Sequence, residues 1–417
     1  MEINSYKEFL NSVSGVQKLL KDERIRNDIK LKRKNSDLRH CYEYYRKFKL
    51  SLVLLVKNQE SLISEVIKQL EGFDIDNYIV VDTGSTDSTL RLLKSIPYVS
   101  LFQAEWKEDY SFMRNMAANY TDADWILTLD SDELFISSPF SLKVLIAILN
   151  EVMLNPFSIS FEQHCPNCSE YGIPDRLYSP KTSLFFGLVH EEVRDKYSNL
   201  PTTSVLTRVK IENQGATPEQ SNKFNKRKRY SSLIEKMIEI EPMNPRWIAF
   251  MNELNIRKLV QSGEYEKLLF THIFVDGNFS TNIENIKRNK YTNILMEKYI
   301  SILVRLKKYE SVIKFSDLGL SVYPEDIPMM FFKMVAQIEL EKRNIQRLYI
   351  TKLNEYITIN KESVYDIYFR DTQLLCVGLA ELSYMMGKVE VAQSIISELS
   401  DYKALKIWEG WHTEEKI

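Results

Sequence analysis

The chain has 417 residues, of which 44% are hydrophobic and 27% are charged, and its formal net charge is -2. This length allows two or three domains with a buried core, and the small charge gives no global field that favours nucleic acid or a membrane surface. With 12 glycines and 12 prolines, long disordered linkers are not expected.

Three features of the sequence bear on cellular location. The first residues, MEINSYKEFL, contain no basic segment followed by an apolar core, so we expect no signal peptide. The longest clean apolar run, residues 50–56, is far shorter than the roughly 20 residues of a membrane-spanning helix. The four cysteines are few for a disulfide scaffold and fit a reducing compartment. We therefore expect a cytoplasmic protein without a membrane span.

The first half of the chain alternates between strand and helix patterns. After a polar helical region, 1–49, we expect strands and helices in the order strand 50–56, helix 61–70, strand 78–81, helix around 90–93, strand 98–102, helix 111–120 and strand 125–129. Short apolar runs that alternate with helical spacing indicate a parallel sheet wound with helices. Ligands of such sheets bind beyond the carboxyl ends of the strands.

From about residue 221 the pattern becomes almost entirely helical. Three short segments that begin at Gly263, Lys307 and Gly387 each lie between helical stretches and are typical of turns in helix–turn–helix units. The first two are further apart than the roughly 34 residues of a tetratricopeptide repeat. We predict three regions: a helical region 1–49, an α/β domain 50–220 and a degenerate helical repeat 221–417, with an ordinary helical bundle as the alternative for the last.

Polar groups follow three of the predicted strands. Asn58 and Glu60 follow the first strand, the segment 82–87 (DTGSTD) follows the second, and the segment 130–133 (DSDE) follows the fourth. Carboxylates that lie this close repel each other unless a cation lies among them, and Mg²⁺ or Mn²⁺ prefers oxygen ligands. Side chains two apart on an extended segment point to the same side, so Asp130 and Asp132 form a candidate metal pair.

A fourth group leads into the predicted helix 111–120. The segment 105–110 (EWKEDY) precedes it, and Arg114 lies in its first turn. A helix N-terminus and an arginine together suit an anion such as a diphosphate.

These four motifs, LVKNQE, VVDTGSTDST, EWKEDYSFMRN and WILTLDSDELF, resemble in this order the segments of a family 2 glycosyltransferase domain. Further on, FGLVHEE resembles the G-x-V-H-E segment of one branch of that family, and NQGATP with the basic residues 226–229 resembles its H-N-G-Y region and basic helix. With the helical C-terminal part, the layout is similar to the peptide S-glycosyltransferases that modify glycocin bacteriocins of the sublancin type.

The resemblance implies a GT-A nucleotide-sugar-binding domain followed by a tetratricopeptide-like domain. It implies inverting, metal-dependent transfer of a hexose from a UDP-sugar, commonly UDP-glucose, to a Cys or Ser side chain of a precursor peptide. The resemblance, carried over residue by residue, implies a nucleotide-sugar site. It comprises Val56, Asn58, Glu60, Asp82, Asp87, Asp109, Arg114, Asp130 and His190. The Mg²⁺ or Mn²⁺ site comprises Asp130, Asp132 and His190.

The catalytic candidates are Asp132, through the metal, and Glu191 as the base that takes the acceptor proton, with Glu192 or Glu133 as alternatives. Two positions depart from the family pattern: Lys57 replaces an aromatic residue, and Asn213 replaces a histidine.

Other interpretations stay open at this point. A family 2 transferase that acts on a saccharide or lipopolysaccharide core also carries the V-H-E segment, and a non-catalytic repeat scaffold is an alternative of another class. Cys165 and Cys168 form a Cys-x-x-Cys pair beside His164, which we interpret as a loop because a structural zinc site needs four ligands. The sequence leaves the choice of hexose and the oligomeric state open, with a homodimer as one option.

Overall fold

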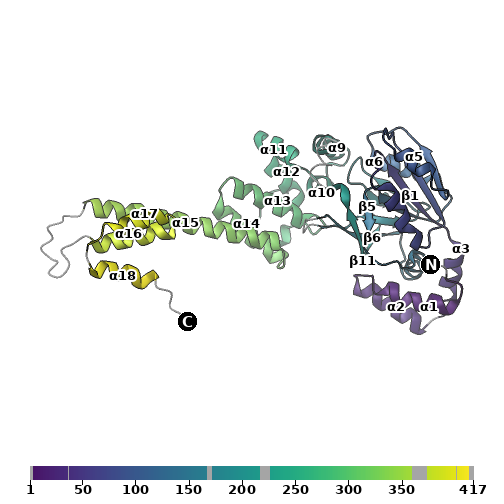
Figure 1. The fold of residues 1–417 in the computed structure, drawn as a ribbon, viewed down its shortest axis with the longest axis horizontal. Coiled ribbons are helices and arrows are strands. Elements are labelled where there is room, and N and C mark those ends of the chain that lie inside the picture. Colours follow the sequence, from purple (N-terminus) through teal and green to yellow (C-terminus); the bar gives the residue numbers. More distant parts are fainter. Residues whose placement is uncertain are drawn as a thin grey trace. The chain divides into compact units, whose positions relative to one another are not determined.

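A computed structural model of the chain describes residues 3–35, 37–166, 171–216, 226–358, 373–400 and 402–412. Its contacts divide the chain into two compact units, Met1–Lys258 and Leu259–Ile417. In Figure 1 the first unit runs from purple to teal and the second from green to yellow. The finer division that we made at residues 49/50 and 220/221 stays a prediction.

The first unit opens with three helices that pack on a later one. They are α1 (Tyr6–Gln17), α2 (Glu23–Asn35) and α3 (Arg39–Lys47), and all three contact α7 (Leu142–Val152). The residues from Leu142 to Leu149 are all buried, which a surface helix with a single apolar face would not show. The apolar side chains of α7 share one hydrophobic cluster with the N-terminal helices and with the sheet, so this helix is covered on more than one side.

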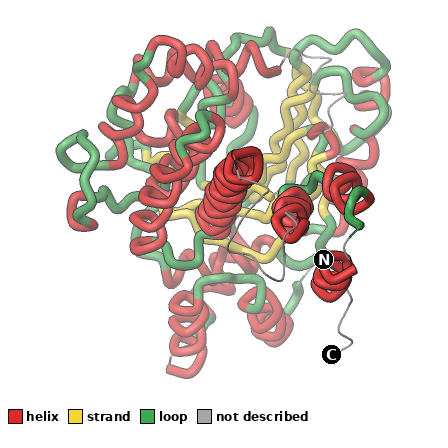
Figure 2. Tube along the Cα trace, turned by 90° about the vertical axis from the view of Figure 1, so that its left-hand side faces the viewer, coloured by secondary structure: helices red, strands yellow, loops and turns green. Residues whose placement is uncertain are grey.

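Within the described residues, nine strands form one mixed sheet, drawn in yellow in Figure 2. The strands are β1 (Leu50–Val56), β2 (Asn77–Asp82), β3 (Val99–Gln103), β4 (Trp125–Asp130), β5 (Glu133–Phe135), β6 (Phe157–His164), β7 (Tyr171–Gly172), β8 (Asp175–Tyr178) and β11 (Thr203–Asn213). Their order is β3-β2-β1-β4-β8-β6-β11-β5, and β7 pairs with β6. A separate two-stranded sheet pairs β9 (Ser183–Phe186) with β10 (Glu192–Asp195).

The predicted parallel arrangement holds for β3, β2, β1 and β4, which run parallel to one another. The rest of the sheet was not predicted: β8 runs antiparallel to both β4 and β6, and β5 runs antiparallel to β11. Since β1 lies between β2 and β4, the strand order reverses there, and the loops after these three strands share one edge of the sheet. Ligands of open α/β sheets bind at such a reversal.

Shorter helices cover the remainder of the first unit. They are α4 (Ile63–Lys68), η1 (Gln69–Gly72), α5 (Thr89–Lys94), α6 (Tyr110–Ala118), η2 (Gln214–Ala216), α9 (Lys226–Ile240) and α10 (Pro245–Ala249). Helix α11 (Glu253–Ser262) begins in the first unit and ends in the second. Helix α6 contacts β1, β2 and β9, so its first residues arrive near the sheet edge where the strands end.

The second unit is helical in its described residues. It contains α12 (Tyr265–Ile273), η3 (Ile283–Asn285), α13 (Thr292–Arg305), α14 (Tyr309–Val322), α15 (Ile327–Thr358), α16 (Gln373–Met385), α17 (Val389–Ser397) and α18 (Tyr402–His412). The three predicted turns are present, and Gly263, Lys307 and Gly387 have positive φ angles of 76°, 56° and 73°. The predicted fold class, an α/β domain followed by an all-helical region, is confirmed. Of the helices that the structure describes, none combines the length and the apolar character that crossing a bilayer requires.

Candidate active site

The loops after β1 and β2 are tied to each other at the shared edge. Oδ1 of Asn58 accepts a hydrogen bond from the backbone N–H of Thr86 at 2.8 Å, and the N–H of Asn58 donates to Ser85 Oγ at 2.9 Å. Asn58 has a φ of 52°, in the left-handed region that asparagine tolerates better than most residues. The carbonyl of Val56 accepts from the N–H of Thr83 at 2.9 Å. The sequence-predicted residues Val56 and Asn58 therefore fix the relative position of the two loops.

Glu60 and Asp87 add a second tie between these loops. The carboxylate of Glu60 accepts from the N–H of Ser88 at 2.8 Å, and Asp87 accepts from the N–H of Glu60 at 3.3 Å. The two carboxylates are thus brought together, as the prediction of one nucleotide-binding edge requires. Their direct contact with a nucleotide stays a prediction.

Asp82, at the end of β2, is fully buried, and one of its oxygens is unused. Oδ1 accepts from the N–H groups of Gly84 and Ser85, both at 3.0 Å, which shapes the turn; Gly84 has a φ of 104° that favours glycine. Oδ2 is shielded from solvent and has no hydrogen-bond partner among the described residues. A buried carboxylate oxygen without a donor is costly, so this atom is suited to accept an N–H from a ligand.

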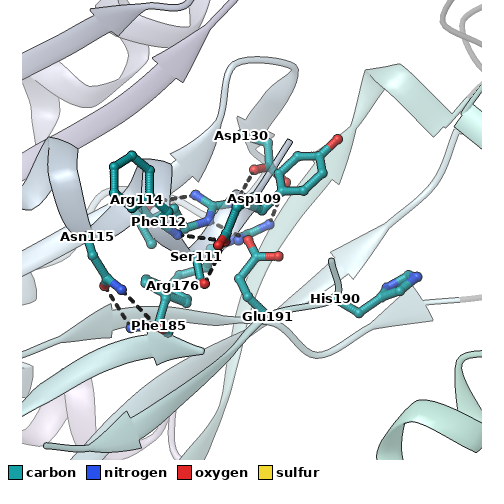
Figure 3. Close-up of polar contacts among 12 residues, drawn as sticks. Asp109, Ser111, Phe112, Arg114, Asn115, Asp130, Arg176, Phe185, His190 and Glu191 are labelled. Atoms are coloured by element: carbon teal, nitrogen blue, oxygen red, sulfur yellow. Dashed lines mark hydrogen bonds and ion pairs between the residues drawn. The ribbon is translucent and has the colours of Figure 1, made fainter. Parts of the chain in front are cut away.

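Helix α6 starts at the next strand end, capped by a predicted site residue. Asp109 is the N-cap, and its Oδ1 accepts from the N–H of Phe112 at 2.9 Å and from Ser111 Oγ at 2.8 Å. The side chain of Asn115 exchanges two hydrogen bonds with the backbone of Phe185, at 2.8 and 2.9 Å. These contacts fix the helix, and with it the direction in which Arg114 points (Figure 3).

Arg114 is buried and engaged on three sides. Its Nη2 donates to Asp130 Oδ1 at 2.6 Å, its Nε donates to Glu191 Oε1 at 2.5 Å, and its Nη1 donates to Thr128 Oγ1 at 2.8 Å. Figure 3 shows Arg114 lying between these two carboxylates. The predicted residues Arg114, Asp130 and Glu191 therefore form one cluster. Since Nε, Nη1 and Nη2 each already donate to a protein oxygen, Arg114 acts on the site by positioning these carboxylates, and its direct contact with a diphosphate stays a prediction.

A second arginine, Arg176 of β8, was missed by sequence reasoning. Its side chain is 5% exposed, and it pairs with Asp130 Oδ2 at 3.0 Å and with the fully buried Glu133. Burial raises the pKa of Glu133 to about 7, although Arg176 opposes the shift. Burial also raises the pKa of Asp130, but the charges of Arg176 and Arg114 outweigh it and hold that pKa well below its usual range. Asp130 is thus ionised and bonded on both oxygens by arginines.

Asp132 and Asn213 present oxygens around one point beside Gly215. A Cβ added at Gly215 would lie 1.7 Å from Asp132 Oδ2 and 3.3 Å from Asn213 Oδ1, so any other residue there would displace the Asp132 carboxylate. Asn213 Oδ1 is buried and accepts no hydrogen bond from a described residue. Magnesium is commonly held by one or two carboxylates together with substrate phosphates, so Asp132 with the Asn213 carbonyl fits a hard cation.

The other two predicted metal ligands lie in different surroundings. Both oxygens of Asp130 are taken by arginines, and the His190 ring stacks on Phe250 with ring centres 4.4 Å apart. In Figure 3 the His190 ring points away from Arg114 and Asp130. Burial lowers the pKa of His190 to about 4, so its imidazole is neutral at pH 7. Among the described residues, no group of three His, Cys, Asp or Glu side chains is placed to hold a metal ion.

The three candidate bases differ sharply in their contacts. Glu133 is fully buried beside Arg176, and Glu192 pairs with Arg194 at 2.8 Å and Arg246 at 3.3 Å. The Glu191 side chain is 12% exposed; its Oε1 is bonded to Arg114, and its Oε2 bonds no described residue. Glu191 is therefore the one of the three whose second oxygen is available to a proton.

The Cys-x-x-Cys segment lies partly outside the described residues. His164 ends β6, and the half-buried Cys165 donates from Sγ to the carbonyl of Pro166 at 3.4 Å. Cys168 lies outside the described residues.

A family model and several relatives match the chain. Residues 51–152 match the model of glycosyl transferase family 2. The glycosyltransferase SunS, of Bacillus subtilis strain 168 and of Bacillus phage SPbeta, is 26% identical over 267 residues, which cover 60% of this chain and 61% of SunS. The chain thus spans less than two thirds of the length of these relatives.

Two further proteins are similar to the chain, one over a short segment and the other at low sequence identity. A TPR repeat-containing protein of Synechococcus elongatus is 33% identical over 84 residues, 20% of each chain. The crystal structure of S. aureus TarS is 14% identical with a TM-score of 0.35, covering 69% of this chain and 55% of TarS. A shorter TarS structure, 1-349, in complex with UDP-GlcNAc, is 13% identical with a TM-score of 0.33, covering 70% of this chain and 92% of that one. The family match and the strand-end motifs together identify residues 51–152 as a family 2 glycosyltransferase domain.

Proposed function

We propose that this chain, through its family 2 glycosyltransferase domain, transfers a hexose from a UDP-sugar to a Cys or Ser side chain of a bacteriocin precursor peptide. UDP-glucose is the expected donor, and the cytoplasm is the expected location. The observation that carries the proposal is the convergence of the Asp82 turn, the Asp130–Asp132 segment and Glu191 in one unit. Similarity to SunS supports a transferase, and the resemblance to glycocin peptide S-glycosyltransferases supports the peptide acceptor.

The nucleotide is recognised at the loops after β1 and β2. Uracil carries an imide N–H, and the unpartnered Oδ2 of Asp82 is an acceptor that such a group would satisfy. Asn58, Glu60 and Asp87 hold the surrounding backbone in place through their own hydrogen bonds. A buried acceptor without a partner favours a base that can donate an N–H at that position.

A divalent cation, Mg²⁺ or Mn²⁺, would be held by Asp132 and the Asn213 carbonyl. When bound, it supplies positive charge that stabilises the leaving diphosphate. Asn213 here takes the position of the histidine expected from the family pattern. Asp130 takes a different part: with both oxygens fixed by Arg114 and Arg176, it is a rigid acceptor for donor hydroxyl groups.

Glu191 takes the acceptor proton at Oε2 while Arg114 holds Oε1. The acceptor sulfur or oxygen attacks the anomeric carbon from the face opposite to the diphosphate, and the bond to the diphosphate oxygen breaks as the new bond forms. The sugar configuration therefore inverts. A thiol with a pKa of about 8.5 needs less help from a base than a serine hydroxyl does.

The helical second unit is proposed to be a tetratricopeptide-like repeat that binds the peptide, since helical repeats commonly present peptide-binding surfaces. The support is its set of helix pairs joined by turns at Gly263, Lys307 and Gly387. Whether the chain acts alone or as a homodimer does not alter the chemistry of the site.

The experiment is an incubation of the full chain with radiolabelled UDP-hexoses, Mg²⁺ or Mn²⁺ and paired Cys and Ser peptides of glycocin type. We expect label on the peptide, and more from one UDP-hexose than from the others. Label transferred only to a saccharide or lipopolysaccharide core would replace the peptide acceptor with the alternative one. Nucleotide binding without transfer to either acceptor class would leave the non-catalytic scaffold as the correct interpretation.

A further inference from the structure

Arg229 of α9 differs from the other arginines around the site. Arg114 and Arg176 pair with the carboxylates described above, and Arg194 and Arg246 both pair with Glu192. Arg229 forms no ion pair with any carboxylate that the structure describes. A partly buried guanidinium without a counter-charge is unusual, because burial of a charge is favourable only when the charge is compensated.

Arg229 is instead enclosed by aromatic rings. Its guanidinium carbon lies 5.9 Å from the ring centre of Trp106, 5.7 Å from that of Tyr110 and 5.8 Å from that of Tyr230. Its Nη2 donates to the hydroxyl of Tyr110 at 2.5 Å. Cation–π contacts and one hydroxyl orient the group but supply no full negative charge.

Two N–H donors in this cluster have no acceptor. Nε of Arg229 and Nε1 of Trp106 are both shielded from solvent and make no hydrogen bond with a described residue. The Trp106 ring packs against Tyr110 at 4.7 Å between ring centres, so both donors belong to one local arrangement. Buried donors are nearly always satisfied, and two unsatisfied ones side by side indicate a missing acceptor with more than one oxygen.

The cluster lies between the two segments that bear the reacting groups. Tyr110 follows the N-cap Asp109 as the first residue of α6, four residues before Arg114. On the other side, Tyr230 packs against the ring of His190 at 5.5 Å, and His190 immediately precedes Glu191. Arg229 is therefore held beside the carboxylate cluster although it pairs with none of its members.

Charge counting shows that a diphosphate bound beside this cluster needs a cation other than Arg114 and Arg176. Asp130, Glu133 and Glu191 face only Arg114 and Arg176 within their cluster, so full ionisation leaves one negative charge over. A sugar nucleotide brings a diphosphate with two more negative charges to the same place. Because Arg114 and Arg176 already bond protein carboxylates, neutralisation of the diphosphate needs a further cationic group.

We propose that Arg229 and Trp106 bind the diphosphate of the nucleotide-sugar, with the guanidinium and the indole N–H donating to its oxygens. This inference rests on the proposed function and deepens it, since it assigns the leaving group to a second set of residues besides Asp132 and Asn213. Arginine forks match phosphate oxygens well, and an indole N–H adds a fixed donor.

Calorimetric titration of the full chain with uridine, UMP and UDP tests the proposal. In Arg229→Gln we expect UDP binding to weaken by about 10- to 100-fold, the range for losing charged hydrogen bonds, while uridine binding changes less than about 2-fold. Trp106→Phe keeps the ring but removes the N–H, so UDP binding should weaken by roughly 3- to 10-fold. Lys107→Gln, which removes the same charge at an exposed neighbouring position, is the matched control and should leave UDP binding unchanged.

Each other outcome has a definite meaning. Equal losses for uridine and UDP in both variants would show that the cluster only supports the fold, and unchanged UDP binding would overturn the proposal directly. Weaker binding of an acidic acceptor peptide with UDP binding intact would assign Arg229 to the acceptor instead. If the wild-type chain bound neither uridine nor UDP, the proposed function would fail, and this inference with it. Arg229→Lys, which keeps the charge, covers the case in which Arg229→Gln does not fold.

Discussion

Replacement of Arg176 by methionine should lower the stability of the first unit far more than its position on a four-residue strand suggests. Arg176 is 5% exposed and bridges Asp130 and Glu133, and the Glu133 side chain is 0% exposed. Methionine fills a similar space but leaves the buried carboxyl of Glu133 without its arginine, so Glu133 must carry an uncompensated charge or take up a proton. The raised pKa of Glu133 should rise further, because the cation that opposes the shift is gone.

The magnitude follows from the burial of the pair. Breaking a buried ion pair on one side costs about 3–5 kcal/mol, whereas an exposed pair contributes roughly 0–1 kcal/mol. Lys181 and Asp124 form such an exposed pair, with side chains 63% and 28% exposed, so Lys181→Met is the matched control. For a unit of this size each kcal/mol lowers Tm by about 2–4 °C, so Arg176→Met should lower Tm by roughly 6–20 °C.

Scanning calorimetry of the full chain measures both variants. Adding Glu133→Gln to Arg176→Met removes the buried ionisable carboxyl that has lost its arginine. The double variant should therefore recover part of the lost stability rather than lose more. The two residues touch, and such non-additivity is expected of them. A Tm of Arg176→Met within about 2–3 °C of that of Lys181→Met would refute the predicted loss of stability. So would a double variant in which Glu133→Gln lowers stability by as much as it does alone. Neighbours in one charge network are expected to couple by about 0.5–3 kcal/mol.

Three further predictions concern the metal, the base and pH. Asp132→Asn should lower turnover by at least about 10²-fold, and excess chelator should abolish the wild-type reaction; full activity with chelator present would contradict this. Glu191→Gln should slow transfer to a Ser peptide more than to a Cys peptide, with the Cys reaction recovering as pH rises from about 6.5 to 9; equal slowing at every pH would leave Glu191 a purely positioning role. In the second unit, burial and the charge of Asp326 raise the pKa of Glu297 from 4.5 to about 8. The stability this group contributes is therefore fully present below the unfolded pKa and lost as pH rises through about 8, so Glu297→Gln should flatten the change in urea midpoint between pH 5 and 9.

The sequence was informative where local pattern decides structure. The run 50–56 became β1 with the same bounds, because a segment that is apolar except for Ser51 suits a strand covered on both faces. Asn58, Glu60, Asp82 and Asp87 came together because parallel strands end at one edge, which chain order alone predicts. Asp109 became a helix cap, for which its short acceptor side chain is suited.

Contacts between segments far apart in the chain leave no local pattern in the sequence from which they could be predicted. Arg176 lies on a strand of four residues and meets Glu133 and Asp130, which precede it by 43 and 46 positions. Nothing in the tetrapeptide DRLY indicates that its arginine compensates carboxylates on two other strands, β4 and β5. Likewise, His190 reads as a metal ligand by type, but its ring stacks on Phe250, which comes 60 residues later. Periodicity identifies elements, whereas which side chains meet depends on how distant elements pack.

We propose above that the first unit transfers a sugar from a UDP-hexose, and the mass of the acceptor peptide reports this transfer. Mass spectrometry of a Cys-containing glycocin-type peptide, incubated with the full chain, UDP-glucose and Mg²⁺, should show the mass of one or more added hexoses. The same incubation with Asp132→Asn should show the unmodified peptide at early times. Unmodified peptide with the wild-type chain for every UDP-hexose supplied, or equal modification by Asp132→Asn, would contradict the account.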